Sequence, residues 1–282
     1  MMNPFELINL SLTSSKARRA VIFFSRIKSR FWVGIGIHGS PFINIKESRR
    51  IGMSWEYSWT SNPSKVGLTT HTARLDLYSY ECIHLFSESR MHDCMKWYEI
   101  IKPVLGCQIG HASVDNPKPS ITDWLRSHQD SIGGISILEG DEENVKYLLK
   151  TIRVLGDLSL KISPRSYQLE FPEGLTRLEI DTAELINYDQ LLRLKVRNIN
   201  LRGSILTNQE INGFLKSWMS CESHLDLKSI EIDIPLSKAV NEIMDLPHEV
   251  TKIGYKIKRC DRKEANVTFG LWTRPYLYLS ID

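Results

Sequence analysis

Residues 206–218 read LTNQEINGFLKSW, and this stretch predicts an amphipathic helix set between two strands. Thr207 and Glu210 have the spacing of a capping box, in which two side chains satisfy each other's backbone N–H groups at a helix start. Strand-like apolar runs lie on either side, at Ile199–Leu201 and Leu227–Ile234. The apolar side chains of the helix recur at helical spacing, at Ile211, Phe214, Leu215, Trp218 and Met219. Beside strands such a stripe is more often core than a ligand pocket, and we interpret it as core.

Similar strand-like runs recur on the N-terminal side, at Gly134–Leu138, Leu158–Ile162 and Leu175–Ile180. The five runs are centred on Ile137, Leu160, Leu178, Leu201 and Ile230, so the steps between centres are 23, 18, 23 and 29 residues. Helical patterns fill several gaps, at Ser120–His128 before the first run and at Asp141–Ile152 after it. A strand plus a helix at this spacing is typical of leucine-rich repeats. An ordinary α/β domain with a parallel sheet uses the same elements and remains the alternative.

The first residues predict two short helices. Asn3 can cap the first helix, Pro4 occupies its first position and Glu6 completes a capping box. Ser14 and Ser15 interrupt this helix and can begin a second one through Lys16–Val21. The first helix is unusually apolar, with Leu7, Ile8, Leu10 and Leu12. So small an element must pack these side chains on the rest of the chain or on another protein.

The middle of the chain favours strands. Aromatic and β-branched residues are concentrated in the runs Phe31–Ile37, Phe42–Ile45, Met53–Trp59 and Thr69–Tyr80. A helix follows at Asp93–Ile101, where Pro103 is expected to stop it, and a Pro-containing loop at 116–119 indicates a boundary. The tail predicts antiparallel strands at Lys252–Ile257, Val267–Trp272 and Pro275–Ile281, joined through the polar turn Cys260–Asn266.

These patterns predict an α+β protein with a short N-terminal helical segment, a β-rich middle region, an irregular leucine-rich-repeat-like α/β array and a C-terminal antiparallel hairpin. We divide the chain into four segments, namely partial helices at 1–30, a β-rich region with one helix at 31–118, the repeat-like region at 119–235 and the hairpin part at 236–282.

Composition narrows the classes of protein. The 282 residues carry a net charge of +3 with 42% hydrophobic residues, as in ordinary folded domains. Seven basic and no acidic residues lie between Leu7 and Lys46, which could meet nucleic acid or an acidic protein, although a solvated helix face is the commoner explanation. Five scattered cysteines suggest no disulfide framework, and Ala20–Phe24 is too short for a membrane span. We expect a cytoplasmic or nuclear protein without a membrane partner.

The chain contains the glycine spacing of a dinucleotide-binding fingerprint without the helix that this motif requires. Gly34, Gly36 and Gly39 match G-x-G-x-x-G, and Glu56 stands where the ribose-binding acid belongs. The mechanism needs these glycines to open a helix that faces the pyrophosphate. The residues after Gly39 instead alternate like a strand, so we predict that the glycines lie in or beside a strand and that no cofactor binds.

Soft metal ligands are sparse. Cys82 and His84 form one pair and His92 and Cys94 another, but one-residue spacing is interpreted here as pointing the two side chains apart. The sequence has no nucleophile elbow, phosphate-binding loop or His-Glu-x-x-His helix. We therefore predict no catalytic residue, no metal and no cofactor.

Two stretches resemble a known family. Residues 4–19, PFELINLSLTSSKARR, resemble the second half of an F-box as found in the large nematode F-box families. Residues 206–218, with Asp189–Leu192, Leu227–Ile230 and a tail strand ending near Trp272, resemble the type 2 F-box-associated domain of those families. An F-box normally begins with a Leu-Pro turn and a further helix upstream of this point, so we expect the F-box of this chain to be incomplete at its N-terminus.

The resemblance implies a substrate-recognition subunit of an SCF-type cullin ubiquitin ligase. Carried onto this chain, the F-box surface that binds a Skp-type adaptor would comprise Pro4, Leu7, Ile8, Leu10 and Leu12. The F-box-associated and repeat region would hold a protein substrate. Two other classes of function remain open, a nucleotide-dependent or hydrolytic enzyme using the glycine motif and a nucleic-acid-binding module using the basic N-terminus.

Overall fold

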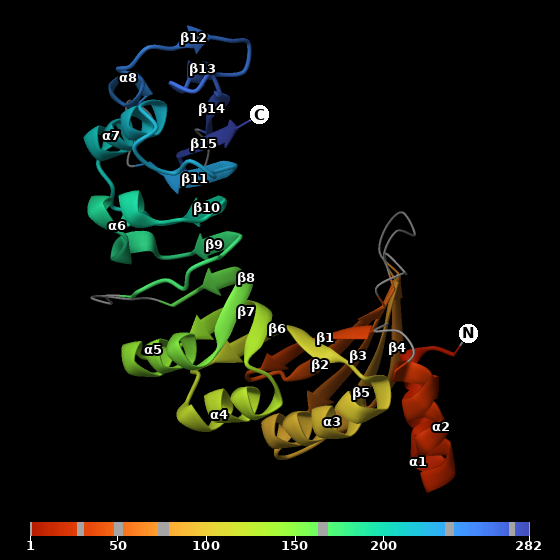
Figure 1. Ribbon diagram of the computed structural model, residues 1–282. Coiled ribbons are helices and arrows are strands. Elements are labelled where there is room, and N and C mark those ends of the chain that lie inside the picture. Colours follow the sequence, from red (N-terminus) through yellow and green to blue (C-terminus); the bar gives the residue numbers. More distant parts are fainter. Residues whose placement is uncertain are drawn as a thin grey trace. The chain divides into compact units, whose positions relative to one another are not determined.

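The computed structural model describes residues 2–26, 31–47, 53–72, 79–162, 169–234, 240–270 and 274–281 (Figure 1). The chain forms two compact units. The first comprises Met1–Asn116 with Ser127–Ile135, and the second comprises Pro117–Arg126 with Ser136–Asp282. Each unit combines helices with a sheet of parallel and antiparallel strands, so the predicted α+β class is confirmed.

Among its described residues the first unit has three α-helices, one short 3-10 helix and six neighbouring strands. Its helical elements are α1 (Pro4–Thr13), α2 (Ser15–Arg26), η1 (Pro63–Lys65) and α3 (Arg90–Leu105). Its strands are β1 (Phe31–Ile37), β2 (Phe42–Glu47), β3 (Met53–Thr60), β4 (Gly67–Thr72), β5 (Ser79–Phe86) and β6 (Gln108–Asp115). They lie in the order β6-β1-β2-β3-β5-β4. Strand β7 (Ser131–Glu139) begins in the first unit and ends in the second.

Aromatic side chains join the sheet of the first unit to its helices. Trp55, Tyr57 and Trp59 alternate along β3, which places all three on one face, and each is buried. The Tyr57 ring lies 4.9 Å from that of Phe5 on α1 and 5.5 Å from that of Trp97 on α3. The apolar first helix therefore packs on its own chain.

Two predictions for this unit are wrong. The expected single strand at Thr69–Tyr80 falls on two strands that pair antiparallel, β4 and β5, and residues 73–78 lie outside the described part of the chain. Helix α3 begins earlier than predicted and continues past Pro103. Pro103 lies in the last turn, where it removes a single helical hydrogen bond, and the helix ends instead at Gly106, whose φ of 60° favours glycine.

The second unit follows the predicted alternation of strands and helices. Its helical elements are α4 (Pro119–His128, whose last residues belong to the first unit), α5 (Glu142–Thr151), η2 (Ala183–Leu185), α6 (Tyr188–Arg193), α7 (Asn208–Met219) and α8 (Val240–Ile243). Its strands are β8 (Arg153–Leu160), β9 (Arg177–Ile180), β10 (Asn198–Leu201), β11 (Ser229–Asp233), β12 (Glu249–Val250), β13 (Tyr255–Lys258), β14 (Glu264–Gly270) and β15 (Tyr276–Ile281). They lie in the order β12-β13-β14-β15-β11-β10-β9-β8.

Strands β8 to β11 are parallel neighbours, as predicted from their spacing. The Lys161 N–H also donates to the Ile137 carbonyl of β7, 2.8 Å away. The strands β13, β14 and β15 pair antiparallel, and β15 joins them to β11, so the predicted antiparallel pairing of the tail is confirmed. The predicted turn Cys260–Asn266 is too long, because β14 begins at Glu264, and the predicted strand end at Trp272 lies outside the described residues. Within this unit the helices α5, α6 and α7 lie on one side of the parallel strands (Figure 1).

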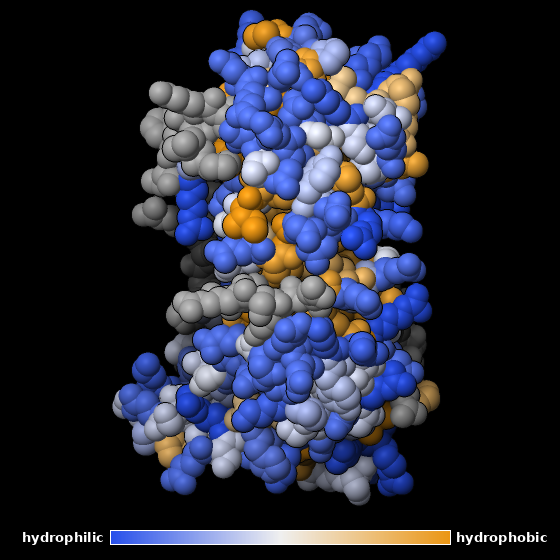
Figure 2. Space-filling view, turned by 90° about the vertical axis from the view of Figure 1, so that its left-hand side faces the viewer, coloured by the Kyte–Doolittle hydropathy of each residue, from blue (hydrophilic) through white to orange (hydrophobic). Residues whose placement is uncertain are grey.

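Strict alternation builds the core of the second unit. Leu178, Ile180, Ile199, Leu201, Ile230 and Ile232 are buried, while the residues between them are partly or fully exposed. Helix α7 begins at the predicted capping box and buries Ile211, Phe214, Leu215 and Trp218 completely, although Met219 is partly exposed. The core interpretation of its stripe is therefore confirmed. The helical side of this unit presents mainly hydrophilic side chains, with apolar ones showing between them (Figure 2).

Candidate functional site

The N-terminal helices begin as the sequence predicts. Asn3 Oδ1 accepts from the Glu6 N–H at 2.8 Å, and the Asn3 N–H donates to Glu6 Oε2 at 2.7 Å. Ser14 Oγ accepts from the Ala17 N–H at 3.1 Å, which supports the start of α2. Helix α2 is longer than the predicted Lys16–Val21, because it continues for five residues to Arg26.

The five residues predicted to bind an adaptor do not form one surface. Pro4, Leu7 and Ile8 are buried, and Ile8 has no exposed area. Leu10 and Leu12 are exposed, with 52% of Leu12 accessible. Successive helical residues are rotated by about 100°, so a short helix that is apolar on several sides presents only part of that surface. Of the five predicted residues, only Leu10 and Leu12 are therefore exposed.

Helix α2 adds exposed apolar residues that the sequence analysis missed. Phe23 is 73% exposed and Phe24 is half exposed. Exposed basic side chains accompany them, at Lys16, Arg18 and Arg19. Phe23 and Phe24 were missed because the predicted helix ended at Val21, before this apolar pair. We name the exposed side chains Leu10, Leu12, Phe23 and Phe24 the helical patch.

The parallel sheet of the second unit has a face whose side chains point away from the core. In register across its strands lie Asn200 of β10, Glu231 of β11 and Tyr278 of β15. The next outward pair is Asp233 of β11 and Tyr276 of β15. None of these five side chains is buried. We name these five residues the tyrosine–carboxylate face.

Charge is unevenly balanced across this sheet. The Arg202 guanidinium lies 3.6 Å from a Glu179 oxygen and 3.4 Å from an Asp181 oxygen, which neutralises the carboxylates of β9 and the residue after it. Glu231 instead accepts from the Asn200 side-chain amide at 3.4 Å, and Asp233 accepts from the Gly203 N–H at 2.8 Å. Among the described residues no cation pairs with Glu231 or Asp233. Their negative charge is therefore available to a partner.

The two tyrosines give this face flat aromatic surface. Tyr276 and Tyr278 are each more than a third exposed. The Tyr276 ring lies over Gly270 of β14, because a Cβ at Gly270 would come within 2.1 Å of the ring. Any larger residue at position 270 would displace the ring. The lack of a side chain at Gly270 thus leaves room for the ring of Tyr276, which lies opposite Asp233.

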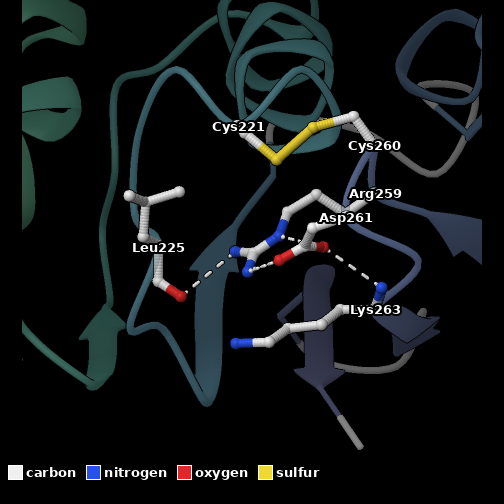
Figure 3. A network of polar contacts seen from close by, with 6 residues as sticks. All are labelled: Cys221, Leu225, Arg259, Cys260, Asp261 and Lys263. Atoms are coloured by element: carbon white, nitrogen blue, oxygen red, sulfur yellow. Dashed lines mark hydrogen bonds and ion pairs between the residues drawn. A yellow bond between two sulfur atoms is a disulfide. The ribbon is translucent and has the colours of Figure 1, made fainter.

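A buried arginine organises the turn between β13 and β14 (Figure 3). Arg259 donates through Nε and Nη2 to both carboxylate oxygens of Asp261, at 3.0 and 2.7 Å, and through Nη1 to the Leu225 carbonyl at 3.1 Å. Its guanidinium also lies 5.2 Å from the Trp218 ring centroid. The hydrogen bonds from Arg259 lower the pKa of Asp261 to about 2. This network attaches the turn to the segment that follows α7.

The cysteine prediction is partly wrong, because Cys221 and Cys260 form a disulfide beside this network. The two residues are 39 positions apart, so their proximity depends on the tertiary fold and no local spacing reveals it. The Cys260 N–H also donates to the Met219 carbonyl at 2.8 Å. Hydrogen bonds and the disulfide therefore hold the same turn.

The glycine motif lies where the sequence analysis placed it. Gly34 and Gly36 belong to β1, and Gly39 lies in the turn before β2, which pairs antiparallel with β1. No helix opens at these glycines. Glu56 lies on β3, two strands away, where its Oε2 accepts from the Asn44 side-chain amide at 3.3 Å.

The interpretation of Cys82 and His84 is wrong in its geometry. Residues two apart on a strand share a face, and Cys82 Sγ lies 3.9 Å from His84 Nδ1 and 3.8 Å from Glu56 Oε1. Burial and the neighbouring Glu56 raise the pKa of the Cys82 thiol to about 12, so it stays protonated. His92 and Cys94 do lie apart, on α3, where Cys94 is buried and His92 exposed. Within the described ranges no three His, Cys, Asp or Glu side chains are grouped to hold a metal ion.

The search of protein families gives one match. Residues 166–232 match the model described as F-box associated, which spans β9, α6, β10, α7 and β11. The F-box-associated part of the resemblance is thereby confirmed. Neither the curated proteins nor the solved structures contain a match. Among the described helices none is long and apolar enough to cross a membrane.

Proposed function

We propose that the chain is a substrate-recognition subunit of an SCF-type cullin ubiquitin ligase and has no catalytic chemistry of its own. The observation that carries this proposal is the F-box-associated match at residues 166–232. A domain of that class points to substrate recognition in a ubiquitin-ligase context. The second unit would hold a protein substrate, and the N-terminal helices would attach the chain to a Skp-type adaptor.

The helical patch supports the adaptor half of the proposal. Leu10, Leu12, Phe23 and Phe24 are large apolar side chains that the chain leaves exposed on two adjoining short helices. Exposed apolar groups of this kind mark binding sites for other proteins. In this arrangement Leu10 and Leu12 would contact the adaptor, whereas Pro4, Leu7 and Ile8 would hold α1 against its own sheet.

The proposed function assigns the protein to the cytoplasm or nucleus, where thiols are kept reduced. The Cys221–Cys260 disulfide would then open. The turn would keep its place through Arg259 and the hydrogen bond from Cys260 to Met219, because neither depends on the sulfur atoms. The fold of the second unit is therefore compatible with a reducing compartment.

A quantitative pull-down with a purified Skp-type adaptor tests this function. We expect the full chain to retain the adaptor, and the double variant Leu12→Ser, Phe23→Ser to retain at most about a tenth as much, because hot-spot anchors dominate such interfaces. Ile253→Ser serves as the control, since Ile253 is about as exposed as Phe23 but lies in the second unit. Failure of the wild-type chain to retain any adaptor would refute the adaptor half of the proposal.

A further inference from the structure

The tyrosine–carboxylate face combines two kinds of group that recognise cations. Glu231 and Asp233 supply negative charge that no described cation neutralises, while Arg202 neutralises the acidic residues of β9. Tyr276 and Tyr278 supply exposed aromatic rings on the adjacent strand. Aromatic faces attract ammonium and guanidinium groups, and carboxylates pair with both.

The geometry of these groups repeats along the strands. Glu231 and Asp233 are two residues apart on β11, and Tyr278 and Tyr276 stand opposite them on β15. Two residues along a strand span roughly 6.8 Å. An extended peptide places side chains on one side at the same interval. Basic residues at alternate positions of such a peptide would therefore meet one tyrosine–carboxylate pair each.

We propose that this face binds an extended protein segment that carries lysine or arginine at two alternate positions. The inference rests on the proposed function, because it names the class of substrate segment that the F-box-associated region would recognise. Charge complementarity selects the basic partner. Register selects the alternate spacing, since neighbouring basic residues in an extended chain point to opposite sides.

Small polar side chains flank the tyrosine–carboxylate face on the same side of the sheet, at Asn198 and Ser229 in one row of paired residues and at Ser280 beside Ser229. The charged residues of that side lie farther away, on β8 and β9, where Arg177 is in register with Asp157 and Glu179 is paired with Arg202. The small side chains leave space for a backbone to approach, whereas the larger tyrosines stand beside the carboxylates. The Tyr276 ring needs the room left by the missing side chain of Gly270, so the face also has a residue that controls its shape without contacting the ligand.

Fluorescence anisotropy with the full chain and two labelled nonapeptides tests the proposal. One peptide, Gly-Ser-Ser-Lys-Ser-Lys-Ser-Ser-Gly, carries its lysines at alternate positions. The other, Gly-Ser-Ser-Lys-Lys-Ser-Ser-Ser-Gly, has the same composition and charge with adjacent lysines. We expect the first peptide to bind at least about fivefold more tightly, because only it can place both cations on the face. Equal affinities, or no binding of the first peptide, would overturn the proposal.

Three variants locate the binding. The pair Glu231→Gln, Asp233→Asn keeps the hydrogen bonds from Asn200 and Gly203 but removes both charges, and should weaken binding of the alternate peptide about tenfold. Tyr278→Ser should weaken it by a smaller factor. Glu184→Gln in η2 and Tyr147→Ser on α5 remove an exposed carboxylate and an exposed tyrosine elsewhere, and should leave it unchanged. Equal effects of face and control variants would overturn the assignment.

The experiment separates this inference from the proposed function. Peptide binding is measured on the chain alone, whereas the adaptor pull-down reports on the helical patch. Retained peptide selectivity with no adaptor binding would leave the inference standing and remove the ligase function. Retained adaptor binding with no peptide selectivity would leave the ligase function standing and overturn the inference.

Discussion

The strands of the two units differ in the kinds of side chain that they place on the two faces of the sheet. In the second unit the inward residues of β9 to β11 are all aliphatic, and the outward ones are all polar or charged. In the first unit β1 carries glycine and tryptophan on the side opposite its buried aliphatic residues, and β3 buries three aromatic side chains. Strict alternation fixes strand register, as it does in β3, whereas a glycine-containing strand such as β1 specifies its register less strongly.

In the second unit the two faces of the sheet have different roles, because the buried face stabilises the fold and the outward face is proposed to bind a partner. Side chains beneath the helices are completely buried and hold the fold together, while the outward face is free to select a partner. The first unit uses its helices in both ways, because α1 buries Ile8 and exposes Leu12. Substitutions of buried and of exposed residues on the same element should therefore have different effects on stability and on binding.

The largest expected effect contrasts Trp218 with Tyr278. Trp218 of α7 is completely buried and its ring also lies against the Arg259 guanidinium, so Trp218→Ala should lower the free energy of unfolding by about 3–5 kcal/mol. Tyr278→Ala should lower it by only about 1 kcal/mol, because more than a third of the side chain is exposed on the outward face of the sheet. Urea denaturation followed by circular dichroism measures both. Equal losses would contradict the division into a stabilising and a recognising side.

Much of the second unit could be predicted from its sequence. The spacing of Ile137, Leu160, Leu178, Leu201 and Ile230 placed five strands, and Thr207 with Glu210 placed the start of α7. Both signals are local, because they depend on periodicity and on hydrogen bonds between residues three apart. The tyrosine–carboxylate face was missed, since β11 and β15 are far apart in sequence and become neighbours only in the sheet.

The first unit was harder to predict for the same physical reason. The run Thr69–Tyr80 looked like one strand because both β4 and β5 are rich in β-branched and aromatic residues, and their mutual pairing is tertiary information. Cys82 and His84 share a face by strand geometry alone, so that error could have been avoided. The buried half of α1 could not be assigned, because Tyr57, whose ring contacts Phe5 of α1, lies on the distant strand β3.

A second contrast lies within α1. Ile8→Ala should lower the free energy of unfolding by about 2–5 kcal/mol, because Ile8 is completely buried. Leu12→Ala should change it by less than ~0.5 kcal/mol, since more than half of the side chain is exposed. Thermal melting of the two variants beside the wild type measures the difference. A large loss for Leu12→Ala would place it in the core and remove it from the helical patch.

The disulfide provides a third comparison, between the second unit in its oxidised and reduced forms. Closing a 39-residue separation should stabilise the oxidised form by about 2–4 kcal/mol. Melting with and without a thiol reductant measures this difference, and Cys260→Ser should melt like the reduced protein under both conditions. If the reductant lowers the melting temperature of Cys260→Ser as well, another thiol linkage is responsible.

A fourth comparison is between neutral and acidic pH, and it concerns a buried histidine of the second unit. Burial lowers the pKa of His224 to about 4, and its ring packs 5.0 Å from that of Phe214. The unfolded chain takes up a proton below about pH 6.5 while the folded chain stays neutral, so stability falls from pH 6.5 towards 4. The loss from this residue is at most about 3 kcal/mol. His224→Leu should remove that part of the slope, and an unchanged slope would assign it to other groups.

The central claim is that the helical patch binds the adaptor while the tyrosine–carboxylate face stays available to a substrate. Hydrogen–deuterium exchange of the full chain, with and without a purified Skp-type adaptor, tests it most directly. The adaptor should slow exchange in α1 and α2 and leave exchange in β10, β11 and β15 unchanged. Slower exchange confined to β10, β11 and β15, or no change anywhere in the chain, would contradict it.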